Sequence, residues 1–142
     1  NSEWKTVIDV NLTGTFNFSK LVIPIMTTQK FGRIINISSF TAFMGVPGAS
    51  NYAASKAGVV ALTKSLAKEV AKYGITVNSI APGYFDIGMF HDFDAATKKK
   101  ILSQIPAGRL GQPNEITELI KLINDSSYLN GQIFTLDGGL SA

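Results

Sequence analysis

The sequence predicts an α/β fold with a parallel β-sheet. Three short, predominantly apolar runs alternate with longer segments whose apolar residues recur with the 3.6-residue period of a helix. The first of these runs is a nearly continuous series of isoleucines, which is typical of a parallel strand buried on both faces. Helical connections between strands supply the crossovers that parallel pairing requires. We therefore expect three recognisable strands with flanking helices.

The chain opens with a long predicted helix that extends from Glu3 to about Gln29. Its apolar residues follow the helical period and predict one broad buried face: Trp4, Val7, Ile8, Leu12, Phe16, Leu21, Val22 and Ile25. A short turn that contains Gly32 then leads into the first strand, residues 34–37.

A second long helix is expected from about Asn51 to Tyr73, after a loop at residues 40–50 that contains glycine and proline. Its buried face is marked by Val59, Leu62, Leu66 and Val70. Gly74 is expected to end this helix as a C-terminal cap, because glycine readily adopts the left-handed backbone conformation of such a cap. The opposite face carries Ala53, Ala57 and Ala61. These small side chains suit close helix packing or a simply exposed alanine-rich surface.

Two further strands are predicted at residues 75–80 and 131–136. Between them lies the most individual part of the sequence, residues 84–106. A helix follows near Pro113, because proline is favoured in the first turn of a helix. Its apolar stripe consists of Ile116, Leu119, Ile120 and Ile123.

Composition excludes several classes of function. The 142 residues have the size of one domain, and 45% hydrophobic with 16% charged residues is ordinary for a globular protein. The formal net charge is +3, and the basic residues are scattered apart from Lys98–Lys100, so no nucleic-acid partner is expected. The chain contains no cysteine and a single histidine, His91, so it lacks a thiolate nucleophile and the residues of a cysteine or histidine metal cluster. No metal site is predicted.

No apolar run approaches the length of about 18 residues that a membrane span requires, and the opening residues do not form a signal peptide. We therefore expect a soluble, cytoplasmic protein with no membrane partner. The chain begins at Asn1 rather than at Met, inside a helix-like pattern. Such a beginning fits a fragment or a processed product better than a natural start.

The groups best suited to chemistry lie near the start of the second long helix. Tyr52 and Lys56 are four residues apart, which places a phenol and an ammonium on the same helix face. A nearby ammonium stabilises a phenolate, so Tyr52 is a candidate general acid. Ser39 follows the strand at 34–37, and its hydroxyl should meet this helix at the crevice where open α/β sheets bind ligands. A Tyr–Lys pair alone is more often a snorkelling lysine beside a half-buried ring.

The ordered set of motifs resembles the short-chain dehydrogenases/reductases, most closely the 3-oxoacyl carrier-protein reductases. The resemblance is carried by Ser39, by Tyr52-x-x-x-Lys56, by Asn11 within Asp9-Val-Asn-Leu-Thr-Gly14, by Val77–Gly83 and by Asp137-Gly-Gly139. It covers essentially the whole chain but only the carboxyl half of the family's doubly wound Rossmann domain. We therefore expect residues 1–142 to form a single partial domain of this kind.

The resemblance implies an oxidoreductase that moves a hydride between NADP(H), or NAD(H), and a ketone or secondary alcohol. The favoured substrate is a 3-oxoacyl thioester. In the family's scheme, Tyr52 protonates the carbonyl oxygen and Ser39 donates a hydrogen bond to it. Lys56 lowers the pKa of the Tyr52 phenol and binds the hydroxyl groups of the nicotinamide ribose. Asn11 orders a water molecule that links Lys56 to solvent.

The turn after the strand at 75–80 is expected to hold the nicotinamide. The resemblance places Pro82, Gly83 and Phe85 there, and the absence of a Cβ at Gly83 would let a ring approach the backbone. The chain then departs from the family pattern, because Ile87 stands where relatives have a threonine whose hydroxyl reaches the cofactor. Loss of one such hydrogen bond costs about 1 kcal/mol, which is about fivefold in affinity.

The sequence contains no glycine-rich pyrophosphate turn of the kind that a complete dinucleotide-binding domain needs. The strand at 34–37 should therefore present an unpaired apolar edge, which we expect to recruit a missing first half or a second copy of the chain. The resemblance also implies a homo-oligomer that forms through the two long helices.

The expected partner is a small carbonyl compound, free or bound to a carrier protein or coenzyme A. Lys98–Lys100 either meets such an acidic carrier or forms a solvated helix face. An alternative hypothesis is a catalytically silent half-domain that serves as an oligomerising or binding module.

Overall fold

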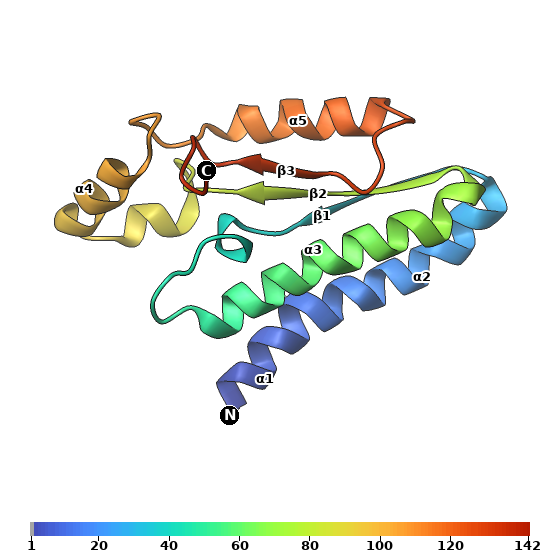
Figure 1. Ribbon diagram of the computed structural model, residues 1–142, viewed down its shortest axis with the longest axis horizontal. Coiled ribbons are helices and arrows are strands. Elements are labelled where there is room, and N and C mark those ends of the chain that lie inside the picture. The colour runs from blue at the N-terminus through green and yellow to red at the C-terminus, as the bar shows by residue number, and fades with distance from the viewer. Residues whose placement is uncertain (1) are drawn as a thin grey trace.

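A computed structural model describes residues 2–142, except for the side chain of Met89. A three-stranded parallel sheet lies between two helical layers (Figure 1). Helix α5 (Pro113–Asp125) covers one face of the sheet, and α2 (Gly14–Gln29) and α3 (Ser50–Val70) lie on the other. The short helix α4 (Ala95–Gln104) stands at the end of the sheet.

The sheet has the strand order β1-β2-β3. Strands β1 (Gly32–Ile37) and β3 (Ile133–Leu136) flank β2 (Ile75–Pro82), and both pair with it in parallel. Every residue of β2 except Pro82 is buried. The expected fold class is confirmed, and β1 is an edge strand of the sheet that the structure describes.

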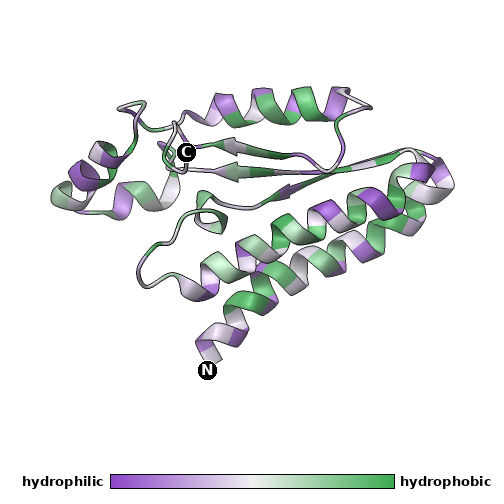
Figure 2. Ribbon diagram, viewed as in Figure 1, coloured by the Kyte–Doolittle hydropathy of each residue, from purple (hydrophilic) through white to green (hydrophobic). Residues whose placement is uncertain are grey.

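The first helical segment runs without a break through α1 (Ser2–Ile8), a π-helical turn at Asp9–Thr13 and α2, as expected. The prediction of one broad buried face is wrong. Ser19 is the one buried residue described in this segment, whereas Trp4, Leu21 and Ile25 of the predicted face are 48–69% exposed. Hydrophobic residues run along this helical segment in Figure 2. The segment extends past the edge strand β1, and no described element covers the part of its surface that lies there.

Helix α3 packs on β2 and ends as predicted. Its Leu66, Ala67 and Val70 form a core with residues of β2. A 3₁₀ turn at Ala71–Tyr73 follows, and Gly74 has the left-handed φ of 75°. A Cβ on Gly74 would also lie 2.5 Å from the carbonyl oxygen of Lys30, so both its conformation and its surroundings require glycine.

The segment after β2 forms a separate small core with the loop after β1 and the C-terminus. This core consists of Phe40, Phe90, Ile101, Ile105, Leu110 and Leu140. The segment contains a 3₁₀ helix at Gly88–Asp92 and then α4, whose first turn is capped by the Asp94 carboxylate. Its packing against Phe40 places it beside the carboxyl end of β1.

Among the described residues, no helix is both long and apolar enough to cross a membrane. The same part of the chain contains no group of three His, Cys, Asp or Glu side chains arranged to hold a metal ion.

Candidate active site

A cavity of about 560 Å³ lies at the carboxyl ends of β1 and β2, beside the first turns of α3. Six of the seven residues expected at the site line it: Ser39, Tyr52, Lys56, Pro82, Gly83 and Phe85. The seventh, Asn11, lies on another element and lines a neighbouring cavity.

Tyr52 and Lys56 lie on one face of α3, as their spacing predicted. The Lys56 Nζ is 5.6 Å from the centroid of the Tyr52 ring and donates a hydrogen bond of 2.9 Å to the carbonyl oxygen of Ile37. Burial lowers the pKa of the Lys56 ammonium, because desolvation disfavours its charged form. The ammonium has three N–H donors, and this contact uses one of them.

The Ser39 hydroxyl is oriented by a neighbour that the sequence did not indicate. Ser39 is buried, and its Oγ accepts a hydrogen bond of 3.2 Å from the main-chain N–H of Thr41. Because a serine hydroxyl has one proton and two lone pairs, this bond leaves the Ser39 proton free to donate. Ser39 can therefore donate to an oxygen atom in the cavity.

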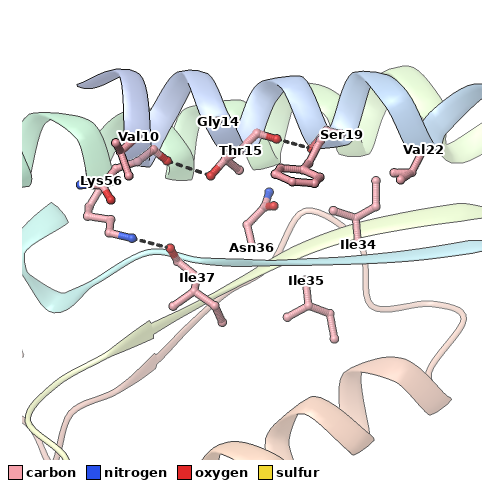
Figure 3. A pocket seen from close by; sticks show the side chains of 12 residues that line it. Val10, Gly14, Thr15, Ser19, Val22, Ile34, Ile35, Asn36, Ile37 and Lys56 are labelled. Atoms are coloured by element: carbon pink, nitrogen blue, oxygen red, sulfur yellow. Dashed lines mark hydrogen bonds between the residues drawn. The ribbon is translucent and has the colours of Figure 1, made fainter. Parts of the chain in front are cut away.

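Asn11 lines a second cavity that Lys56 also borders. Both residues line a cavity of about 450 Å³ between α2 and β1 (Figure 3), and Ile37 and Lys56 line this cavity as well as the first one. Asn11 sits in the π-helical turn, a feature frequent at functional sites. Its carbonyl oxygen accepts a hydrogen bond of 2.8 Å from the Thr15 hydroxyl. Lys56 thus stands at the boundary between the two cavities.

The turn after β2 is packed against the C-terminal segment. The Gly83 N–H donates to the Leu136 carbonyl oxygen at 2.9 Å, and a Cβ on Gly83 would lie 2.7 Å from the Cα of Asp137. The main chain of Asp137 therefore fills the space beside Gly83, which gives this glycine a structural reason in addition to the expected approach of a ring. Phe85 is buried, and its ring lies where a Cβ on Gly111 would be.

Apolar side chains form most of the remaining wall. The rings of Phe40 and Tyr84 pack with their centroids 5.1 Å apart, and burial raises the pKa of Tyr84. Phe90, Phe93 and Ile116 complete this wall. The side chain of Ile87 also lines the cavity and is 50% exposed.

Residues 1–141 match a family model described as enoyl-(acyl carrier protein) reductase. The chain belongs to the short-chain dehydrogenase/reductase family. Among its relatives, the 3-oxoacyl-[acyl-carrier-protein] reductase FabG of Thermotoga maritima is 44% identical over 140 residues, which are 97% of this chain and 57% of the relative. The 3-oxoacyl-[acyl-carrier-protein] reductase of Synechocystis is 45% identical over 141 residues, which are 97% of this chain and 56% of the relative.

Solved structures of the same family superimpose on nearly the whole chain. A gluconate 5-dehydrogenase from Burkholderia cenocepacia, in complex with NADP and tartrate, is 36% identical with a TM-score of 0.94, covering 99% of this chain and 57% of that one. A 3-oxoacyl-[acyl-carrier protein] reductase from Brucella melitensis is 35% identical with a TM-score of 0.95, covering 100% of this chain and 54% of that one. The resemblance is therefore confirmed, and the chain spans a little over half the length of these short-chain dehydrogenases/reductases. The single partial domain over residues 1–142 stays a prediction, as do the roles of the site residues.

Proposed function

We propose that the protein is an NADP(H)-dependent oxidoreductase that interconverts a ketone and a secondary alcohol. The observation that carries this proposal is that Ser39, Tyr52 and Lys56 line one cavity at the carboxyl end of the sheet. The relatives described above are named as reductases and a dehydrogenase. The alternative of a catalytically silent half-domain finds no support in these comparisons.

In the proposed reduction, Tyr52 donates its phenolic proton to the carbonyl oxygen of the substrate while Ser39 holds that oxygen by a hydrogen bond. Lys56 stabilises the resulting phenolate and returns a proton to it. Asn11, on the other side of Lys56, holds the water through which that proton is replaced from solvent. NADPH, when bound, supplies the hydride that reaches the carbonyl carbon.

The residues present fit the nicotinamide end of NADP(H). Lys56 has two N–H donors beyond the one that it gives to Ile37, and these suit the ribose hydroxyls. The turn at Pro82 and Gly83 borders the same cavity and offers main-chain groups to the ring. Ile87 presents an apolar side chain there and offers no hydroxyl for the cofactor. NAD(H) stays a second possibility for the same site.

The favoured substrate is a 3-oxoacyl thioester. Apart from the reacting groups, the cavity is lined mainly by aromatic and aliphatic side chains, among them Phe40, Tyr84 and Phe90. Such a wall suits an acyl chain. A polyhydroxy acid would leave most of its hydroxyl groups without partners there, which is costly. This argument favours the substrate class of the 3-oxoacyl reductases over that of the gluconate 5-dehydrogenase.

We also propose that the thioester is presented on a carrier protein or coenzyme A, and that the protein is a homo-oligomer. Lys99 and Lys100 are exposed on α4 near the cavity and are available to an acidic carrier. Ala57 and Ala61 are exposed on α3 and permit close approach of another helix. Sedimentation velocity, with and without an acidic carrier protein, tests both statements.

The test of the proposed activity is the loss of NADPH absorbance on addition of acetoacetyl-coenzyme A. We expect Tyr52→Phe to abolish turnover while NADPH binding, followed by nicotinamide fluorescence, stays nearly unchanged. Tyr73→Phe is the matched control, because Tyr73 is also 37% exposed but belongs to the turn after α3 rather than to the cavity. Substantial turnover by Tyr52→Phe would refute the proton-donor role. Failure of the wild-type protein to bind NADPH would refute the proposed function.

A further inference from the structure

We propose that Ser38 is a positioning residue that ties the first turns of α3 to the end of β1 and thereby sets Lys56 and Tyr52 against Ser39. What the positioned groups do rests on the proposed function. The tie itself consists of contacts within this chain and can be measured separately.

Ser38 is joined to two elements at once. Its main-chain N–H donates to the carbonyl oxygen of Ile80 in β2 at 2.8 Å, which continues the pairing of the sheet beyond the end of β1. Its side-chain Oγ donates to the carbonyl oxygen of Lys56 in α3 at 2.9 Å. Ser38 is only 2% exposed, so water does not compete freely for either bond. The side chain therefore links α3 directly to the sheet.

Lys56 is held at both of its ends by consecutive residues. Its ammonium donates to the Ile37 carbonyl oxygen at 2.9 Å, and its own carbonyl oxygen accepts from Ser38. In the proposed reaction the ammonium gains further partners, because it serves Tyr52 and the cofactor. The bond from Ser38 to the main chain does not involve the ammonium. It therefore holds this turn of the helix in place whatever the ammonium contacts.

The bond from Ser38 to Lys56 joins the two elements that carry the proposed reacting groups, so it sets the distances between these groups. Ser39 follows Ser38 directly, and Tyr52 lies one helical turn before Lys56. Misplacement of reacting groups by about 1 Å costs on the order of a hundredfold in rate. Ser38→Ala removes the link without leaving a buried polar group unpaired, because the substitution removes the donor itself and the Lys56 carbonyl oxygen still accepts a main-chain N–H within α3. The variant should therefore fold, while the positions of Tyr52 and Lys56 relative to Ser39 become less fixed.

The test compares Ser38→Ala with Ser79→Ala. Ser79 is a buried serine in β2 whose hydroxyl has no partner among the described residues, so its replacement removes a hydroxyl of similar burial without breaking a link. We expect kcat for ketone reduction to fall about tenfold in Ser38→Ala, with KM changed less than about twofold, and both to stay near wild type in Ser79→Ala. Ser38→Cys, which keeps the size of the side chain and a weaker donor, should lie between the two.

A second measurement does not depend on turnover. Trinitrobenzenesulfonate modifies free lysine amines, and peptide mass spectrometry reports the rate at each residue. The rate at Lys56 should rise about threefold in Ser38→Ala, because the turn that carries this half-buried amine opens more often. Lys64, exposed on the same helix, serves as the internal reference and should not change.

A faster reaction of Lys56 in Ser38→Ala alone supports the link. Wild-type modification rates and wild-type kcat in folded Ser38→Ala would overturn it, as would equal effects of Ser79→Ala. If the wild-type protein reduces no ketone, the proposed function fails, while the modification rate of Lys56 still decides the role of Ser38. If Ser38→Ala does not fold, the same comparison is made with Ser38→Cys.

Discussion

Gly83→Ala should destabilise the protein, because the added methyl group has no space. A Cβ at this position would lie 2.7 Å from both the Cα and the Cβ of Asp137 and 3.3 Å from its carbonyl oxygen. These atoms belong to the main chain of Asp137 or are attached directly to it, so they cannot move away by a change of side-chain rotamer. The Asp137 carboxylate accepts hydrogen bonds from the main-chain N–H groups of Gly139 and Ser141 at 3.0 and 2.9 Å, which fixes the segment. The turn after β2 and the C-terminal segment must therefore separate.

Overpacking of this kind costs about 1–3 kcal/mol. For a chain of 142 residues, this loss lowers Tm by about 3–10 °C. The assay is thermal unfolding followed by circular dichroism. Gly45→Ala is the matched control, because a Cβ on Gly45 would meet no atom within 4 Å. Its Tm should stay within about 1 °C of the wild type.

Equal Tm values for Gly83→Ala and Gly45→Ala would refute the packing argument. NADPH titration of the same variants separates the two reasons for glycine at this position. Loss of NADPH binding with an unchanged Tm would mean that Gly83 is needed for the approach of the nicotinamide and not for its contact with Asp137.

Three further predictions concern the cavity, the interior and the surface. Ile87→Thr should raise NADPH affinity by about fivefold in fluorescence titration, since the new hydroxyl supplies about 1 kcal/mol of hydrogen bonding. Thr63→Val should lower the free energy of unfolding in urea by about 1–3 kcal/mol, because it leaves the buried Asn36 amide without the acceptor that it now has at 2.9 Å. Arg109 holds the pKa of Glu115 at about 2, so the stability from this carboxylate is present above its ordinary pKa of 4.5 and is lost as the pH falls towards 2. The Tm of Glu115→Gln should therefore fall less than that of the wild type over this range.

Controls of the same chemistry are available for each of these variants. Ile87→Val changes the size of the side chain without adding a hydroxyl and should leave NADPH affinity unchanged. Thr117→Val removes an exposed hydroxyl that bonds within α5, and its urea curve should match the wild type. Glu118→Gln removes an exposed carboxylate from the same helix as Glu115. Coincident behaviour of any variant with its control would contradict the corresponding argument.

The strands were predictable because their signals are local. The runs at 34–37 and 75–80 lie inside β1 and β2, whose register pairs Ile34 with Val77. The third strand begins at Ile133 rather than at the predicted Gly131. Gly131 has a φ of 73°, outside the strand region, and its N–H donates to the Val77 carbonyl oxygen. A glycine in a strand-like run does not reveal this conformation by itself, because it tolerates both signs of φ.

The site was predictable where a side chain carries the chemistry and not where the backbone does. Ser39, Tyr52 and Lys56 stand in motifs with fixed spacing, and the structure brings them to one cavity. The N–H of Thr41 that orients Ser39 has no sequence signal, because every residue other than proline has such a group. The partner of the Ser38 hydroxyl lies 18 residues away, so only the packing of α3 on the sheet reveals it.

The first helical segment shows where periodicity misleads. A π-helical turn inserts an extra residue, so residues after Asp9–Thr13 are rotated by about 100° relative to an uninterrupted helix. Apolar residues on the two sides of this turn therefore do not form one straight face, although their spacing in the sequence suggests it. The spacing also marks a surface as apolar without showing what covers it. In this chain, the exposed Val10 and Phe18 border the same cavity as Asn11 and Lys56, so the part of the fold that was predicted wrongly adjoins the candidate active site.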